Sequence, residues 1–420
     1  MTRSLRVRMY RVGFGDCFLL SFLGEDPDRH VLIDCGSITD GKAQVSRVAA
    51  DVIATCTPPG GRPRLDLVVC THRHRDHVGG FKDPVWKDVE VGEVWMPWTE
   101  DFDDPDATRI RNRQSAFALA LSKAMALTAF DADAAPLEDA PAGDMKAASL
   151  AMALNALTNE AAMATVHRGF SGSPPRRFLP TRDTVCEART LPGLPGVRIH
   201  VLGPPRNEAA MASMDPPVGE AYLRLKAAAA STEGLAQANG AFRQSWQMDR
   251  AVFEQRQPGS TFDIKDQKAV DELAEEPDSE LAAAIDRAVN NTSLILMFEV
   301  GDQWLLFPGD AQWGAWNAAL QEPRCNRLLE RTTFYKVGHH GSENATPRSL
   351  VDTVIKQPYT AFLSTRSMTQ WPNIPRRPLL DAMAEKSVTI VRSDSDLVPE
   401  DAGFKAEPGL YVEWRIDVGP

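Results

Sequence analysis

The segment Leu65–His72, LDLVVCTH, limits the fold more than any other part of the chain. Its centre, Leu67–Cys70, is a continuous apolar run without alternating polar positions, which is typical of a strand buried on both faces. Such a strand lies in the interior of a sheet that helices cover. The segment opens directly onto Arg73–His77, so ionisable side chains crowd the point where the strand ends.

Two strand-rich blocks, 1–100 and 290–420, flank a long middle part of helical character. Alanine, leucine and methionine recur at helical spacing in about 105–195 and 206–290, which we expect to be helical insertions at one rim. The pattern predicts one α/β domain over 1–420, in which two mixed β-sheets pack face to face with helices outside. The expected strands are Val7–Val12, Cys17–Leu23, His30–Asp34, Leu67–Thr71, Val91–Met96, Val197–Leu202, 293–300, 303–307, Thr333–Val337, Ala361–Ser364 and Val388–Val391, with a helix at about Pro378–Lys386.

Two further segments carry expectations about exposure. Polar and apolar residues alternate along Leu5–Val12, which predicts a strand with one exposed face. The polar, acidic stretch Asp263–Asp286 is expected to be an exposed loop that a protease can cut. Regulation by cleavage or by a partner protein is therefore conceivable.

Charge and cysteine content exclude some classes of protein. The formal net charge of −11 argues against a surface that coats nucleic acid or anionic membrane indiscriminately, so any nucleic-acid contact must be local. The six cysteines include no CxxC pair and are expected to be reduced core residues of a cytoplasmic protein. No segment approaches the roughly 20 apolar residues of a membrane helix, so we expect no membrane partner.

The segment His72–His77 offers three imidazoles and one carboxylate. Neutral imidazole and carboxylate together suit zinc, iron or manganese. His72 and His74 lie two positions apart, on the same side of an extended segment, whereas Asp76 and His77 turn toward a second position. The sequence therefore predicts a metal centre here, and the alternative is a polar loop with solvated histidines.

Two later strands end in further candidate ligands. Asp310 follows an apolar strand, where an unpaired buried carboxylate would be costly unless cations share it. The alternative for Asp310 is a turn aspartate that its own backbone holds. The segment Lys336–Ser342, KVGHHGS, supplies two imidazoles, an ammonium and a hydroxyl, and a core histidine is the alternative there.

The order of these motifs resembles the metallo-β-lactamase superfamily. Within it, THRHRDH, FPGD and KVGHHGS are similar to motifs of the hydrolase domain of the DNA-uptake competence protein ComEC and its stand-alone relatives. The segments RVGFGDCFLLSF and VLIDCGS resemble the opening strands of that group, and VRIHVLGPP resembles a later one. The resemblance covers the two strand blocks and implies the αββα sandwich of that superfamily.

The resemblance also implies two divalent metal ions, zinc or manganese. The implied ligands are His72 and His74 for the first ion, Asp76, His77 and His340 for the second, and Asp310 as the bridge between them. His339 is the alternative to His340, which is favoured because the family's final ligand commonly precedes a glycine.

The sequence departs from the superfamily at one ligand. Another histidine usually reaches the first metal from the end of a middle strand, but that position here reads Leu202-Gly203-Pro204. His200 lies within the strand and His167 lies upstream, and both are more typical of packed or surface histidines. The first site is therefore expected to be open or weak.

The function that the resemblance implies is metal-dependent hydrolysis, most directly by a nuclease or other phosphodiesterase that uses a metal-activated hydroxide. Asp76 would orient the hydroxide, while Lys336 and Ser342 are candidates to stabilise charge on phosphate oxygens. A solvated lysine and a turn serine are the alternatives for the latter two. Some of the stand-alone relatives resemble effectors of bacterial antiviral defence.

The substrate is open between two classes. Basic runs at 109–113, 167–168 and 174–177 are candidates for a local track that binds nucleic-acid phosphates, or are ordinary solvated faces. A narrow pocket lined by aromatic residues would instead favour a small lactone, lactam or thioester. The residues for such a pocket are Trp95, Trp98 and Trp371. A third reading is a vestigial, non-catalytic metal-binding scaffold.

Overall fold

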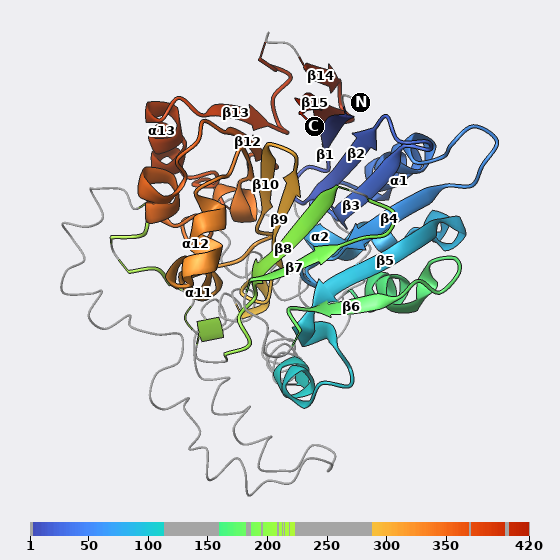
Figure 1. The fold of residues 1–420 in the computed structure, drawn as a ribbon, viewed down its shortest axis with the longest axis horizontal. Coiled ribbons are helices and arrows are strands. Elements are labelled where there is room, and N and C mark those ends of the chain that lie inside the picture. The colour runs from blue at the N-terminus through green and yellow to red at the C-terminus, as the bar shows by residue number, and fades with distance from the viewer. Residues whose placement is uncertain are drawn as a thin grey trace, which may run out of the picture.

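The computed structural model describes residues 3–112, 159–181, 186–222, 288–368, 371–399 and 403–419, apart from residues 195, 208, 209, 212, 214 and 218. Over these residues the protein is α/β, with two mixed β-sheets flanked by helices (Figure 1). Most of the predicted helical insertions and the acidic stretch Asp263–Asp286 lie outside the described residues.

The first sheet has eight strands in the order β14-β15-β1-β2-β3-β4-β5-β6. Strands β3 to β6 are parallel to one another, and the strands from β14 to β3 are antiparallel. The strands are β1 (Arg3–Tyr10), β2 (Cys17–Leu23), β3 (Arg29–Cys35), β4 (Arg64–Val69), β5 (Glu90–Pro97), β6 (Arg176–Leu179), β14 (Phe404–Glu407) and β15 (Tyr411–Val418).

The second sheet has seven strands in the order β13-β12-β11-β10-β9-β8-β7. Strands β10 to β13 are parallel, and β7 to β10 are antiparallel. The strands are β7 (Glu187–Thr190), β8 (Val197–Gly203), β9 (Ile295–Val300), β10 (Gln303–Phe307), β11 (Phe334–Lys336), β12 (Thr360–Leu363) and β13 (Thr389–Arg392).

Apolar side chains from both sheets meet in one cluster that includes Phe18, Phe298, Phe307 and Phe334. The rings of Phe18 and Phe307 lie 5.7 Å apart in an edge-on arrangement. Each such side chain contributes about 1.5–3 kcal/mol on burial, so this layer joins the two halves of the chain firmly. The sequence separates these halves by more than a hundred residues, yet the fold places them face to face.

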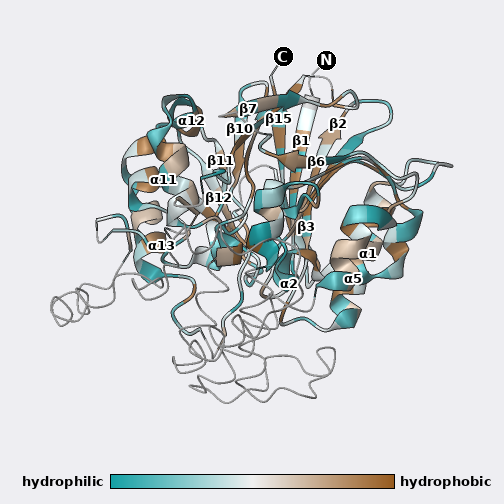
Figure 2. Ribbon diagram, turned by 90° about the horizontal axis from the view of Figure 1, so that it is seen from below, coloured by the Kyte–Doolittle hydropathy of each residue, from teal (hydrophilic) through white to brown (hydrophobic). Residues whose placement is uncertain are grey.

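Helices cover the outer face of each sheet (Figure 2). The helices α1 and α5 pack on the first sheet through apolar residues such as Val48, Val52 and Met163. On the second sheet, α11, α12 and α13 pack through Trp316, Leu329 and others. The helices are α1 (Lys42–Thr55), α2 (Arg75–Val78), α5 (Glu160–Ala164), α11 (Trp313–Gln321), α12 (Pro323–Leu329) and α13 (Arg377–Glu385), with 3₁₀ turns at Gly79–Lys82, Pro84–Asp88, Trp98–Glu100 and Gly338–Gly341 and π turns at Thr165–Gly169 and Leu350–Val354.

The expectation of one exposed face on the first strand is wrong. Arg8, on the face that was expected to be open, is only 5% exposed because α1 covers it. Its guanidinium forms buried ion pairs with Glu413 at 2.7 Å and Asp51 at 2.6 Å, and lies over the ring of Tyr411. A polar residue in an alternating pattern therefore marks a buried ion pair here.

The expected insertion at about 105–195 is not purely helical, since it contains β6 and β7. Both strands are four residues long, and they extend the first and the second sheet respectively. All six cysteines are buried and free, as predicted for core thiols. Within the described ranges, no helix is both long and apolar enough to cross a membrane.

Candidate metal centre

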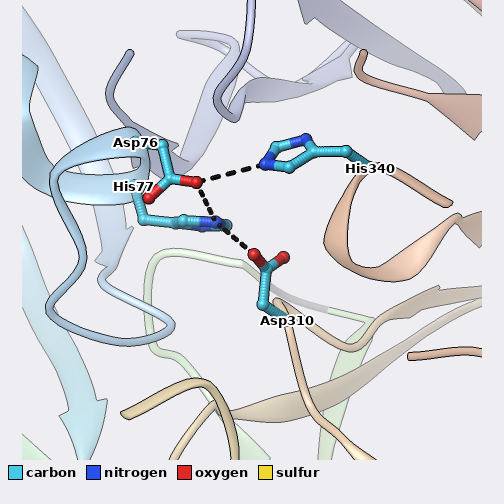
Figure 3. Close-up of side chains that lie close together, drawn as sticks. All are labelled: Asp76, His77, Asp310 and His340. Atoms are coloured by element: carbon cyan, nitrogen blue, oxygen red, sulfur yellow. Dashed lines mark hydrogen bonds and ion pairs between the residues drawn. The ribbon is translucent and has the colours of Figure 1, made fainter. Parts of the chain in front are cut away.

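The predicted ligands lie just after strands that each have at least one parallel neighbour. His72–His77 follow β4, Asp310 follows β10, and His340 follows β11. The carboxyl ends of parallel strands are where α/β proteins usually form their binding sites. Figure 3 shows that Asp76 and His77, from the first half of the chain, face Asp310 and His340 from the second.

Four of these side chains form one buried cluster. Oδ2 of Asp310 lies 3.0 Å from Nε2 of His77, and Oδ2 of Asp76 lies 3.1 Å from Nε2 of His340 (Figure 3). One ligand atom from each of the four residues lies within 4.8 Å of the others. This is a group of buried oxygen and nitrogen atoms that could hold a metal ion.

His72 and His74 form a pair beside this cluster. Nε2 of His72 and Nδ1 of His74 lie 3.2 Å apart, and both side chains are almost completely buried. Burial lowers the pKa of His74 to about 4, with further lowering from the imidazoles of His77 and His339. Burial likewise lowers the pKa of His72, so both rings are neutral at neutral pH, as metal ligands must be.

Charges within the cluster oppose the effect of burial. Burial alone would raise the pKa of Asp310, but His77 and Lys336 lower it well below its usual range. For His77, burial would lower the pKa, but Asp310 and Asp76 raise it well above its usual range. These shifts keep the carboxylates ionised inside the protein.

The ring of His77 is oriented by a carboxylate on the side away from the cluster. Nδ1 of His77 donates to Oδ2 of Asp34 at 2.8 Å, which leaves Nε2 facing Asp310. Asp34 in turn accepts from the backbone N and the hydroxyl of Thr71, at 2.8 and 2.6 Å. A carboxylate behind a histidine is the usual second partner of a metal ligand.

His340 has the same arrangement. Its Nδ1 donates to the backbone oxygen of Ser364 at 2.9 Å, while Nε2 faces Asp76. In both His77 and His340, each ring nitrogen thus faces an oxygen acceptor. Such a ring either carries two protons or binds a cation in place of one of them, so the donor set fits a metal ion.

Asp310 offers one carboxylate oxygen to the cluster and uses the other within the protein. Oδ1 accepts from Nζ of Lys336 at 3.2 Å and from the backbone N of His339 at 3.1 Å. Oδ2 is buried and makes no hydrogen bond of good geometry, although it lies 3.0 Å from His77. An ionised buried oxygen without a donor is compatible with the bridging position that the sequence predicted.

Lys336 lies beneath Asp310, with its side chain 2% exposed. Its ammonium contacts Asp16, Asp310 and the backbone oxygen of Gly309, so its three donors are all used within the protein. Asp16 and Asp310 raise the pKa of Lys336 against the effect of burial. This position suggests that Lys336 holds Asp310 in place. It is less suited to the predicted contact with substrate.

Ser342 and His339 contact each other at the edge of the cluster. Oγ of Ser342 lies 2.9 Å from Nδ1 of His339, and Nε2 of His339 lies 4.0 Å from Oδ2 of Asp310. Ser342 is 9% exposed, and the side chain of His339 is 18% exposed.

The two other candidate histidines lie away from the cluster. Nε2 of His200 contacts Glu299 at 2.7 Å, and its ring stacks on Trp304. His167 lies 3.9 Å from Glu100. Neither takes the place of the absent ligand after β8. This agrees with the expectation from the sequence that both are packed or surface histidines.

Most of the described arginines of the rim have partners within the protein, including Arg176, which donates to the backbone oxygen of Pro174, whereas Arg168 is exposed. Arg111 donates to the backbone oxygens of Thr99 and Asp101, Arg109 pairs with Asp106, and Arg177 pairs with Glu93; Arg113 is outside the described residues.

The tryptophans expected to line a pocket are dispersed. Trp95 lies in the core between the sheets, Trp98 lies beneath Arg206, and Trp371 packs on Phe14. They do not form a common lining.

Sequence reasoning missed two acidic residues of this centre, Asp16 and Asp34. Together with His77 they form a second buried group, and Asp16 also contacts Lys336. Each lies in a segment whose family resemblance was recognised without a role for the acid. An acidic residue within or beside a buried apolar strand was the available signal.

Comparison with models of protein families and with curated proteins finds no match to this chain.

Proposed function

We propose that this chain is a hydrolase of the metallo-β-lactamase fold that binds two divalent metal ions and cleaves phosphodiesters, with nucleic acid as the substrate. Two mixed sheets flanked by helices are compatible with this fold. The observation that carries the proposal is the buried cluster of Asp76, His77, Asp310 and His340 beside the pair His72 and His74. Four carboxyl or imidazole groups buried together without a cation would be costly.

The proposed ligands divide as the resemblance implies. The first ion would be held by His72 and His74, the second by Asp76, His77 and His340, and both by Oδ2 of Asp310. Two such ions would activate water and stabilise charge on the oxygens of a phosphodiester.

The protein's own groups prepare this centre. Asp34 and the Ser364 carbonyl fix the rings of His77 and His340, and Lys336 holds Oδ1 of Asp310 so that Oδ2 stays turned to the cluster. Asp76 lies 3.1 Å from Nε2 of His340 and is the residue that would orient the hydroxide. Ser342, at the partly exposed edge, is a candidate hydrogen-bond donor to a phosphate oxygen.

One observation favours a second substrate class. Three of the described rim arginines, Arg109, Arg111 and Arg177, already have partners within the protein, which weakens the case for a phosphate track. A small lactone, lactam or thioester remains the second candidate, since the same metals would polarise its carbonyl.

The experiment is metal-dependent hydrolysis of single-stranded DNA, duplex DNA, RNA and bis-p-nitrophenyl phosphate, with a lactone and a thioester in parallel. Asp310→Asn should lower the rate at least about 100-fold. This exceeds the loss typical of replacing a residue that contacts a metal ligand but not the metal itself. Asp302→Asn, at an exposed turn, is the matched control and should keep the wild-type rate. Wild-type rates in Asp310→Asn would contradict the proposal, and hydrolysis of the lactone or thioester alone would shift the substrate class.

A further inference from the structure

The first of the two proposed metal sites has few protein ligands. His72 and His74 offer two nitrogens, and Asp310 offers one oxygen that the second site shares. The segment at the end of β8, Leu202-Gly203-Pro204, contains no side chain that binds a metal. Zinc is usually four-coordinate, so this site has room for one further ligand.

His339 lies beside Asp310, the residue proposed to bridge the two ions. Its Nε2 is 4.0 Å from Oδ2 of Asp310, the same oxygen atom that lies 3.0 Å from His77. Its backbone N donates to the other oxygen of Asp310 at 3.1 Å, which anchors the residue to the proposed bridge. His339 and His340 therefore reach the two carboxylates separately, His339 toward Asp310 and His340 toward Asp76.

An unusual backbone produces this divergence. His339 has φ 44° and ψ 52°, and His340 has φ 54° and ψ 20°, so two successive non-glycine residues are in the left-handed region. Each such residue costs on the order of 1–3 kcal/mol, and such strain persists mainly at functional sites. A regular turn would not present both neighbouring rings to the cluster.

The contacts of the His339 ring match those of the other proposed ligands. Nδ1 of His77 contacts Asp34, Nδ1 of His340 contacts the Ser364 carbonyl, and Nδ1 of His339 contacts Oγ of Ser342 at 2.9 Å. Nε2 of His77 and of His340 is then left on the side of the carboxylates, and Nε2 of His339 lies 4.0 Å from Asp310 and 3.4 Å from Nδ2 of Asn290. This is the arrangement by which proteins orient an imidazole toward a metal ion.

We infer that His339 is a protein ligand of the first metal ion, through Nε2, and replaces the histidine that the end of β8 does not supply. The inference rests on the proposed two-metal centre. Ser342 is then a positioning residue that orients the ring of His339, so its contact with substrate is not required.

Metal binding tests this directly. Wild-type protein, stripped with a chelator, is titrated with Zn²⁺ by calorimetry and with Co²⁺ by visible absorption. The test variant is His339→Asn, because asparagine tolerates the left-handed backbone that this position requires. The matched control is His167→Asn, which replaces a histidine whose ring contacts Glu100 and is not among the proposed ligands.

We expect two equivalents in the wild type and in His167→Asn. His339→Asn should lose one equivalent or bind it at least about 10-fold more weakly, as His72→Gln should. The double variant His72→Gln/His339→Asn should still bind one equivalent, because both changes affect the same site. Ser342→Ala should weaken that site by about 10-fold to 100-fold while the other site is unchanged.

Two outcomes would overturn the inference and separate it from the proposed function. If His339→Asn binds two equivalents at wild-type affinity, with unchanged far-ultraviolet circular dichroism, then His339 is not a metal ligand. The proposed two-metal centre would be unaffected by that result. A single equivalent in the wild type, lost in His340→Gln and retained in His339→Asn, would overturn both the inference and the two-metal centre.

Discussion

Replacement of Lys336 by methionine removes the buried cation between two carboxylates. The ammonium contacts both Asp16 and Asp310 and also donates to the backbone oxygen of Gly309 at 3.0 Å. Loss of one partner from a buried ion pair costs about 3–5 kcal/mol, because the remaining charge is left without compensation. Methionine has a similar length and no charge, so it isolates this effect from packing.

The loss of unfolding free energy in Lys336→Met should depend on whether a divalent metal ion is present. In a chelator, Lys336→Met should lower the free energy of unfolding by about 3–5 kcal/mol. With saturating Zn²⁺ the deficit should shrink, because a cation bound at Oδ2 of Asp310 would replace part of the lost positive charge. The double variant Asp16→Asn/Lys336→Met should recover part of the loss, since it removes one of the two isolated charges.

The assay is urea unfolding followed by tryptophan fluorescence and by far-ultraviolet circular dichroism, which should give coincident transitions if unfolding is two-state. Lys356→Met, at an exposed lysine, is the control and should change the free energy by no more than about 0.5 kcal/mol. A loss under about 1 kcal/mol for Lys336→Met in chelator, or a deficit that Zn²⁺ leaves unchanged, would refute this account of Lys336.

Two further predictions concern other residues. A Cβ at Gly36 would lie 2.4 Å from the backbone oxygen of Arg75 and 2.5 Å from the backbone N of His77, so Gly36→Ala should displace α2 and weaken metal binding at least about 10-fold by calorimetry, whereas Gly41→Ala meets no atom within 4 Å and should bind normally. Equal affinities in the two variants would count against this geometry. Burial, followed by the charge of Arg6, lowers the pKa of His30 to about 4, so protons bind the unfolded chain more tightly and stability should fall by roughly 3 kcal/mol between pH 6.5 and pH 4. In His30→Gln, the free energy of unfolding measured in urea should fall less steeply between pH 6.5 and pH 4 than in the wild type. Parallel pH dependences in the two proteins would contradict the role given to His30.

Apolar runs made most of the core strands predictable. Leu67–Val69 of β4 and the hairpin of β9 and β10 lie where the sequence places strands, because their side chains are buried in the sheets. The strands β6 and β7 were not predicted, since each has only four residues and neither has a continuous or alternating apolar pattern. The helix α1 and the strand β15 were also not predicted, although Tyr411–Val418 has several β-forming residues.

For the site, local motifs predicted more than long-range contacts could. The ligand types in His72–His77 are close in sequence, so their proximity follows from the chain itself. The contact between Lys336 and Asp16 joins residues more than 300 positions apart, and nothing in either segment specifies it. The direction of the His339 ring depends on a left-handed backbone conformation, which the residue types in that turn do not predict.

The pairing of β1 with β15 has a consequence for how the protein is made. Arg8 lies opposite Glu413, 405 residues further along the chain, and the two form a buried ion pair. At about 5–20 residues per second, a ribosome needs roughly 20–80 s to add the residues between them. For that time the edge of β1 lacks its partner strand, and Arg8 has Asp51 but not Glu413 as a native partner in the nascent chain. Arginines on this open edge would themselves discourage pairing with other strands, so the residues that later fix the register also protect the unfinished sheet from aggregation during synthesis.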